Sequence, residues 1–414
     1  MMNSGDVRRI FWFISTLEDV NFARNFDRFY DGEISYIHTN FITFIYSKFL
    51  LKKRSYIPRL RVKKIFSCPD VSKCFNVISG RLSEEEAKKA YLGIKQLLER
   101  KVTKKMHKGC IFMIPSGRHI HHIAATDFAK MKSIKRLYIN YANFPGYTIF
   151  DPSGTDRESL IYKKKSFLKN LSKKNYDDIA IKKIYEYFSR LKKEQKTIPQ
   201  KASTGVQKTL KAYLFRIDTC LQRLLSVYGD RRVRFHYVAV MREQVSLLAT
   251  IDIENVKEDF IFFPLQVSTD QQILVNYEKG NIFSAIDEAV DCSRILGKTL
   301  VIKEHPAESE IEKIRSYLHE KISKGDRIIF TTSSVQDAIK AAKLIITVNS
   351  TVGLEGLLRG KEVRFLGDSF YKKCSKEELA IYLSEYFIKV DYHTGKGLSR
   401  KIIKEILARV NLHE

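Results

Sequence analysis

The chain has 414 residues, of which 44% are hydrophobic and 12% aromatic, so it can bury more than one core and fits two domains of about 200 residues each. No run approaches the roughly 18 to 20 consecutive apolar residues of a membrane span, and the N-terminus lacks the apolar core of a signal peptide, so we expect a cytoplasmic protein. The net charge of +26, from 73 Lys plus Arg against 47 Asp plus Glu, predicts a polyanionic partner.

The first part of the chain alternates strand and helix patterns, which predicts a parallel sheet. The expected strands lie at positions 8–15, 33–38, 110–114 and 136–139, and the expected helices at 20–30, 41–51, 82–100 and 122–132. The helix at 82–100 has acids in its first turn and bases in its last, as the helix dipole prefers.

The basic residues concentrate in four segments, at positions 52–64, 163–174, 182–201 and 229–234. Two of them fall in a helical, basic stretch at about 160–225, which a loop at 196–205 divides into a hairpin. The chain has no zinc pattern, RNP-like strand or other nucleic-acid module, so we do not expect a nucleic-acid partner. An anionic membrane surface or an acidic acceptor fits the charge better, and a merely solvated basic face stays open.

From position 260 onward the alternation of strands and helices resumes. The expected strands are 260–265, 299–302, 327–332, 344–348 and 362–366, and the expected helices are 282–296, 308–323, 335–343, 352–359, 376–390 and 398–410. The pattern predicts the α/β class, with Rossmann-like domains at 1–240 and 241–414 and the helical insertion in the first. We expect the closing helices to pack back on the first domain.

Three polar motifs follow successive apolar strands of the second domain, at positions 266–270, 303–306 and 349–355. Because open parallel sheets bind ligands at the carboxyl ends of their strands, these motifs outline a nucleotide-sugar site. Gln266 and Asp270 bracket the first polar turn, where the acid either faces the ligand or caps the next helix.

The second motif contains Lys303, His305 and Pro306. Proline is tolerated at the first position of a helix, so Pro306 can begin the following helix, which would place the His305 imidazole beside free backbone amides that favour phosphate. A phosphate would then keep His305 cationic, and Lys303 either adds a second positive contact or faces away. The alternative is a histidine that only caps a turn.

The third motif contains Asn349, Ser350, Thr351, Gly353 and Glu355. Hydroxyl groups at a strand-to-helix corner cap the helix or bind an anion, and Gly353 permits close approach of a ligand. We expect Glu355 in the first turn of the helix, where it accepts hydrogen bonds from ribose, and the alternative is a helix-capping role.

No metal site is expected. The chain has no DxD motif in a loop, and its six cysteines show no CxxC spacing and lie mostly in apolar runs, as structural thiols do. The sequence therefore predicts a site that works without a metal and without a cofactor.

The motifs together resemble those of the capsule-polysaccharide β-Kdo glycosyltransferases of Gram-negative bacteria. The resemblance covers about residues 110 to 375. It is carried by QVSTD, KEHP and NSTVGLEGLLRGKEVRFLG in the second domain, and by IPSGRH and YINYANFPGYTIFDPSGTDRES in the first. It implies the GT-B architecture, in which two Rossmann-like domains face a cleft.

The resemblance also implies a reaction. Kdo (3-deoxy-D-manno-oct-2-ulosonate) would move from the donor substrate CMP-Kdo to a lipid-linked or oligosaccharide acceptor, at the inner face of the inner membrane. Asp270 would be the nucleophile of a retaining double displacement, with His305 beside the departing phosphate, and Gln266, Lys303, Pro306 and the third motif would bind the donor.

On the acceptor side, the resemblance points to Ser116, Gly117, Arg118, Asn140, Asp151 and Glu158. Asn140 stands where the family has a glutamate, so either Asp151 or Glu158 would supply acid-base help, or the donor sugar differs from Kdo. The alternatives are a GT-B transferase that uses another CMP-nonulosonate or nucleotide sugar, and a non-catalytic factor for capsule assembly or export.

Overall fold

The computed structural model describes residues 7–59, 67–164, 166–172, 174–194, 217–218, 220–222, 250–308 and 310–412. The chain forms two compact units. The first comprises Met1–Lys173, Ser203–Arg234 and Ser384–Glu414, and the second comprises Lys174–Ala202 and Phe235–Leu383. The boundary expected near position 240 lies outside the described residues.

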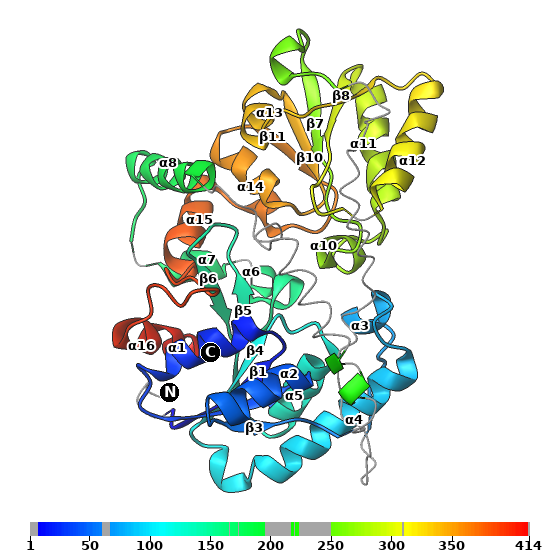
Figure 1. Cartoon of the computed structure of the whole chain (residues 1–414). Helices are drawn as coiled ribbons and strands as arrows, with labels where there is room; N and C mark the ends of the chain where they lie inside the picture. Colours follow the sequence, from blue (N-terminus) through cyan, green and yellow to red (C-terminus); the bar gives the residue numbers. More distant parts are fainter. Residues whose placement is uncertain are drawn as a thin grey trace. The chain divides into compact units, whose positions relative to one another are not determined.

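The first unit contains a six-stranded sheet with the order β3-β2-β1-β4-β5-β6 (Figure 1). Its strands are β1 (Arg9–Ile14), β2 (Glu33–His38), β3 (Arg54–Tyr56), β4 (Cys110–Pro115), β5 (Lys135–Tyr141) and β6 (Thr148–Asp151). Only the β5–β6 pair is antiparallel. The order of the parallel strands is that of a Rossmann fold, whose order reverses between β1 and β4.

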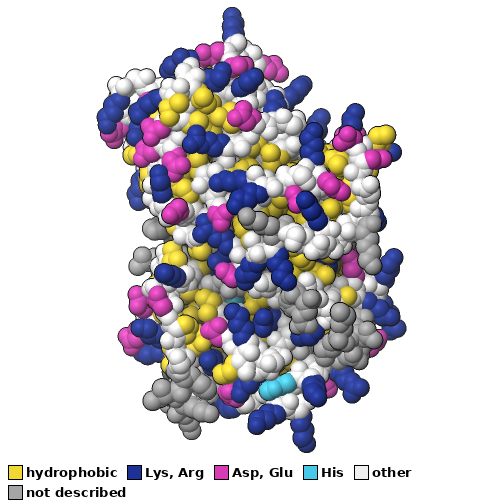
Figure 2. All heavy atoms as spheres, turned by 180° about the vertical axis from the view of Figure 1, so that it is seen from behind, with side chains coloured by type: hydrophobic (Ala, Val, Ile, Leu, Met, Phe, Trp, Pro, Cys, Tyr) yellow, Lys and Arg dark blue, Asp and Glu magenta, His cyan; other side chains and the backbone are white. Residues whose placement is uncertain are grey.

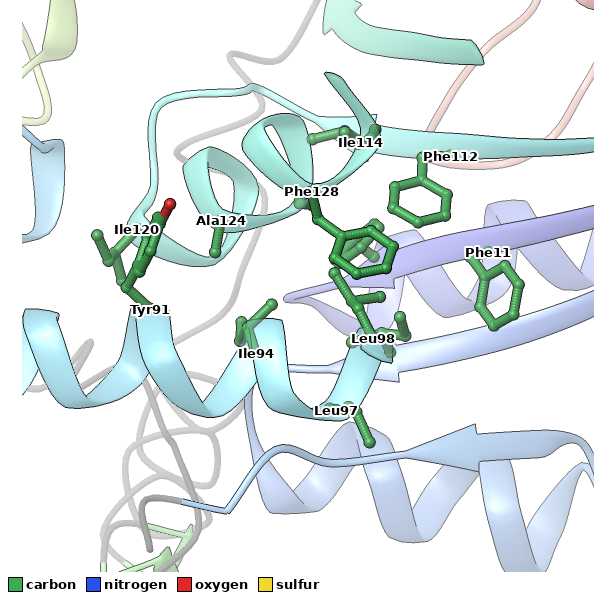
Figure 3. Packing of buried hydrophobic residues seen from close by; sticks show 14 of the residues in the cluster. Phe11, Tyr91, Ile94, Leu97, Leu98, Phe112, Ile114, Ile120, Ala124 and Phe128 are labelled. Atoms are coloured by element: carbon green, nitrogen blue, oxygen red, sulfur yellow. The ribbon is translucent and has the colours of Figure 1, made fainter. Parts of the chain in front are cut away.

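Helices cover both faces of this first sheet. They are α1 (Leu17–Asp27), α2 (Phe41–Ile45) with the π-helix η2 (Tyr46–Leu50), α3 (Phe75–Ile78), α4 (Glu84–Lys101), α5 (Ile120–Met131), α6 (Leu160–Lys163), α7 (Phe167–Leu171) and α16 (Arg400–Ala408). On one face, Ile94 and Leu98 of α4 and Phe128 of α5 pack against Phe112 of β4 (Figure 3). On the other face, α1 and α16 contribute to the core with β1 and β2, so the end of the chain packs on the first unit.

The second unit contains a five-stranded parallel sheet with the order β11-β10-β7-β8-β9. Its strands are β7 (Phe260–Pro264), β8 (Thr299–Lys303), β9 (Ile328–Phe330), β10 (Leu344–Thr347) and β11 (Glu362–Phe365). This order is also Rossmann-like, and it reverses between β7 and β10. The predicted fold class, α/β with two Rossmann-like parts, is confirmed.

The helices of the second unit are α8 (Asp178–Glu194), α10 (Gln271–Leu274), α11 (Ile282–Leu296), α12 (Ile311–Ser323), α13 (Val335–Ala341), α14 (Thr351–Leu358) and α15 (Lys376–Ile381). Apolar side chains of α11 and α12 contribute to one core cluster of this unit, and those of α13 contribute to another. Figure 1 shows α11 and α12 side by side. Helix α8, from the expected helical insertion, groups with this second unit.

The helix expected at 376–390 is shorter than the sequence indicated. Helix α15 ends at Ile381 and continues as the π-helix Tyr382–Tyr386. Ile388 then forms an antiparallel bridge to Thr148 of β6. The end of this stretch therefore pairs with the edge strand β6. The backbone N–H and C=O groups on the outer side of an edge strand need hydrogen-bond partners.

Candidate functional site

The carboxyl ends of β7 and β10 adjoin at the point where the strand order of the second sheet reverses. Register pairs such as Ile261 with Leu344 hold the two strands side by side. The chain leaves β7 toward β8 and leaves β10 toward β11, on opposite sides of this point. Doubly wound sheets bind ligands in the crevice that such diverging connections create.

Gln266 ties the two strand ends together. Its Oε1 accepts hydrogen bonds from the Thr347 hydroxyl at 3.2 Å and from the Asn349 backbone N–H at 3.1 Å. Thr347 Oγ1 in turn accepts from the Ser350 N–H at 3.2 Å. The first and third sequence motifs are therefore joined by one amide, and Thr347 is a residue that the sequence analysis missed.

Helix α14 begins where the third motif predicted it. Ser350 caps the helix by accepting from the Val352 N–H at 3.2 Å, and Thr351 is the first helical residue. Both polar atoms of the Asn349 amide are buried without a hydrogen-bond partner among the described residues. A buried amide of this kind can both donate to and accept from a bound ligand.

Gly353 has a role in the packing of α14. A β-carbon at this position would lie 2.4 Å from Phe365 Cε1 and 2.9 Å from Thr347 Cγ2. Glycine is therefore required because α14 packs closely on β10 and β11. This packing accounts for the glycine without a ligand, and the approach of a ligand stays a prediction.

Glu355 lies in the second turn of α14, not in the first as expected. It is buried, accepts a hydrogen bond from Gln336 of α13, and lies 3.9 Å from the Lys192 ammonium of α8. Burial raises the pKa of the Glu355 carboxyl above its ordinary value, against the opposing effects of Lys192, Gln336 and Arg359. Glu355 thus joins three helices of the second unit.

Asp270 is the N-cap of the short helix α10. Its Oδ1 accepts from the Gln272 N–H at 2.8 Å, and the side chain is half-buried. The capping role that the sequence left open is therefore present. It holds the carboxylate in a fixed orientation in the loop after β7.

The loop after β8 does not begin a helix at Pro306. Helix α12 starts only at Ile311, so the expected position of His305 beside its N-terminus was wrong. Glu308 instead accepts from the Ser268 N–H at 2.6 Å and the Ser268 hydroxyl at 2.9 Å. This carboxylate, which the sequence analysis also missed, ties the second motif to the first.

His305 accepts a hydrogen bond at Nδ1 from the Ala307 N–H, 3.1 Å away. With Nδ1 as the acceptor of this hydrogen bond, the ring N–H is on Nε2. The turn-capping alternative is thus observed, and Nε2–H is the donor that a ligand could use. Lys303 donates to the Thr332 carbonyl at 3.2 Å, toward β9.

In the first unit, Ser116 and Gly117 follow β4 with φ values of 68° and 72°. This left-handed turn leads through Arg118 into α5. The neighbouring strand end carries Ser15, whose hydroxyl lies 2.9 Å from Nε2 of His121. These groups lie at the carboxyl ends of β1 and β4, where the strand order of the first sheet reverses.

Asn140 lies within strand β5, where it pairs with Ile149 of β6. The Asp151 carboxylate is buried and accepts from the N–H groups of Ser153, Gly154 and Leu160 and from the Tyr386 hydroxyl. Burial raises the pKa of Asp151, although these hydrogen bonds oppose the change. Asp151 therefore organises the loop around it.

Glu158 is exposed at the end of that loop and forms a 2.8 Å ion pair with Lys163. The hydrogen bond from Lys163 lowers the pKa of Glu158. Of the two acidic candidates in the first unit, only Glu158 is exposed to solvent.

Lys and Arg side chains are spread widely over the surface shown in Figure 2. The basic segment 229–234 and parts of the other three lie outside the described residues. Across the described ranges, no helix is both long and apolar enough to span a membrane. In the same ranges, no cluster of three or more His, Cys, Asp or Glu side chains has a metal-binding arrangement.

Residues 115–374 match the family described as capsule polysaccharide biosynthesis protein, and the chain belongs to this family. Protein FixF of Sinorhizobium fredii is 32% identical over 117 residues, which cover 27% of this chain and 27% of FixF. The capsule polysaccharide export protein KpsS of Escherichia coli is 30% identical over 115 residues, or 26% of this chain and 29% of KpsS. The chain thus matches less than a third of the length of each relative.

Among solved structures, the β-Kdo 2,7 transferase of Thermosulfurimonas dismutans KpsC matches with a TM-score of 0.46 and 14% identity, covering 98% of this chain and 100% of that one.

Proposed function

We propose that this protein is a glycosyltransferase that moves Kdo from CMP-Kdo to a lipid-linked or oligosaccharide acceptor in capsule polysaccharide synthesis. The supporting observation is the arrangement of the second unit, in which Gln266 and Glu308 join the loops after β7, β8 and β10 at the point where the strand order reverses. Membership of the capsule polysaccharide biosynthesis family supports the same proposal.

In this proposal the loops after β8 and β10 bind the nucleotide, and the loop after β7 acts on the sugar. The Nε2–H of His305 and the amide of Asn349 bind the CMP phosphate, with Ser350 and Thr351 at the N-terminus of α14. Helix N-termini and neutral donors stabilise the negative charge that grows on phosphate as the bond to the sugar breaks.

The proposed chemistry is a double displacement at the anomeric carbon of Kdo. Asp270 attacks that carbon while the bond to the CMP phosphate oxygen breaks, which gives a glycosyl ester and free CMP. An acceptor hydroxyl then attacks the same carbon, the ester bond breaks, and the acceptor proton passes to a base. Of the two carboxylates that the family resemblance offers for this role, Glu158 is exposed whereas Asp151 is buried. Because each displacement inverts the anomeric carbon, the product has the same anomeric configuration as the donor.

The decisive experiment incubates the full chain with CMP-Kdo generated in place and a panel of lipid-linked and oligosaccharide acceptors, with and without a chelator. Mass spectrometry should detect an acceptor extended by one Kdo, and chelation should leave the yield unchanged. CMP binding with no product from any acceptor would favour a non-catalytic assembly or export factor.

A second donor is suggested by Asn140 of β5, because the family resemblance leads us to expect a glutamate at this position. Another CMP-nonulosonate would then be the substrate. A ligand that binds only the folded chain raises its melting temperature, so a thermal screen of CMP-sugars separates the two donors.

A further inference from the structure

The helical segment after β2 exposes three apolar side chains to solvent. Phe49 and Leu50 of the π-helix are 62% and 69% exposed, and Ile45 at the end of α2 is also exposed. The fully buried positions of the two helices are polar, namely Thr43 and Ser47, although Tyr46 also packs partly against the core. A helix that covers a core normally shows the reverse pattern, so these side chains are available to a partner outside the chain.

Thr43 explains why the inside of this segment is polar. Its hydroxyl lies 3.0 Å from Nδ1 of the buried His38 and donates to the Asn40 carbonyl at 3.2 Å. The orientation of the segment is thereby fixed by hydrogen bonds to β2 and its loop. It does not depend on burial of Phe49 or Leu50, so both can be replaced without removing what anchors the segment.

The charges around the exposed side chains are positive. The Lys48 ammonium lies 5.4 Å and 5.6 Å from the ring centroids of Phe44 and Phe49. Lys52 follows the C-cap of the π-helix with a φ of 52°. Neither lysine has an ion pair within the described ranges, whereas Lys53 and Arg54 pair with Asp27 and Glu33. Positions 34–69 contain no Asp or Glu at all. Aromatic and aliphatic side chains beside lysines are typical of segments that lie in the headgroup region of a bilayer.

We propose that this surface, formed by Ile45, Lys48, Phe49, Leu50 and Lys52, docks the protein on an anionic lipid bilayer. The three apolar side chains enter the boundary between headgroups and acyl chains, and the two lysines contact lipid phosphates. Binding to a bilayer is a property separate from the transfer reaction. It rests on the proposed function in one respect, because a lipid-linked acceptor would lie in the same bilayer.

A second exposed apolar pair supplies a matched control. Ile295 and Leu296 at the end of α11 are 82% and 48% exposed, but their neighbours include the exposed Asp291 and an Arg294 that is paired with Asp326. This pair has comparable apolar exposure without an excess of positive charge. It should therefore contribute nothing to binding an anionic bilayer.

The test is cosedimentation of the full chain with phosphatidylglycerol vesicles and with neutral phosphatidylcholine vesicles, at about 0.01 M and 0.15 M salt. At the higher salt, F49S/L50S should lower the partition coefficient roughly tenfold or more, and I295S/L296S should leave it unchanged. K48A/K52A should weaken binding mainly at low salt. Equal binding of F49S/L50S and the unaltered chain, or equal binding to both vesicle types, would overturn the proposal.

Fluorescence tests insertion directly. The only tryptophan of the chain, Trp12, is fully buried, so its emission should not respond to lipid. In F49W, vesicles should shift the emission to shorter wavelength and brominated lipids should quench it, whereas I295W should show neither effect. If the emission of F49W with vesicles is the same as its emission in buffer, position 49 does not insert into the bilayer. If F49S/L50S instead converts a dimer to a monomer with vesicle binding intact, the surface is a contact between copies.

Melting temperatures of all three double variants show whether they fold. Transfer to a soluble acceptor should be the same in F49S/L50S and the unaltered chain, so docking and catalysis can fail separately.

Discussion

The side-chain oxygen of Gln266 lies 3.1 Å from the backbone nitrogen of Asn349. This bond joins the end of β7 to the end of β10, two strands whose connections leave the sheet on opposite sides. The same oxygen accepts from the Thr347 hydroxyl. The Gln266 side-chain amide thus holds together the loops after β7 and β10, which we propose bind the donor.

Gln266→Ala should loosen this junction. It leaves a backbone N–H and a buried hydroxyl without their acceptor, and such a loss costs about 1 to 3 kcal/mol. We expect a lower free energy of unfolding in urea and weaker CMP binding by calorimetry. Gln266→Glu keeps an acceptor oxygen in the same place and should be the more stable of the two. If both variants unfold at the same urea concentration, the two hydrogen bonds do not hold the junction.

Glu308→Ala should separate the loops after β7 and β8. The carboxylate accepts three hydrogen bonds, two from Ser268 and one from the Glu310 N–H. Calorimetry should show weaker CMP binding in Glu308→Ala and an intermediate affinity in Glu308→Gln, which keeps one acceptor oxygen. Glu320→Ala, at an exposed position of α12 outside this loop, is the control and should bind CMP as the unaltered chain does. If Glu308→Ala binds CMP with the affinity of the unaltered chain, Glu308 does not contribute to the CMP site.

His305→Asn tests the phosphate contact without disturbing the turn. The asparagine oxygen can replace Nδ1 as the acceptor for the Ala307 N–H, but the distal N–H is lost. A hydrogen bond to a charged group contributes about 1.5 to 3 kcal/mol, so the CMP affinity should fall roughly ten- to a hundredfold. His305→Gln, which restores a distal donor, should recover part of it. Unchanged affinity in His305→Asn would exclude the contact.

Glu355 should make the stability of the chain depend on pH. Burial raises the pKa of its carboxyl in the folded state, so the folded chain holds the proton more tightly than the unfolded chain does. Ionisation therefore destabilises the fold as the pH rises above the ordinary value of 4.5. Glutamine stays neutral, so Glu355→Gln should gain stability relative to the unaltered chain as the pH rises from 4.5 toward neutrality. Urea unfolding at several pH values measures the difference in the free energy of unfolding between Glu355→Gln and the unaltered chain. A difference that does not change with pH would contradict the prediction.

Local signals account for the parts of the fold that the sequence predicted well. The helix expected at 82–100 is α4, because Ser83 and Glu86 form a reciprocal capping box at its start. The strands before the three motifs were recognised as apolar runs, since both faces of a covered parallel sheet are buried. The short strands β3 and β6 were missed, because three or four residues carry no clear periodicity.

The parts of the candidate site that were missed depend on partners distant in the chain. Glu308 looked like a helical residue, but it accepts from Ser268, 40 positions away. Glu355 looked accessible to ribose, but Lys192 and Gln336 of two other helices surround it. Local patterns locate strand ends, whereas the hydrogen bonds between the loops that follow them appear only in the folded chain.

Asp270→Asn tests the proposed chemistry while preserving the local structure. Asparagine is as good an N-cap as aspartate, so its side-chain oxygen can still accept from the Gln272 N–H and α10 should remain. The amide cannot form the glycosyl ester, so transfer should fall by several orders of magnitude while CMP binding and the melting temperature stay the same. With donor and no acceptor, mass spectrometry of the unaltered chain should find one added sugar on the peptide that contains Asp270. An active Asp270→Asn variant, or an adduct on another peptide, would show that a different residue is the nucleophile.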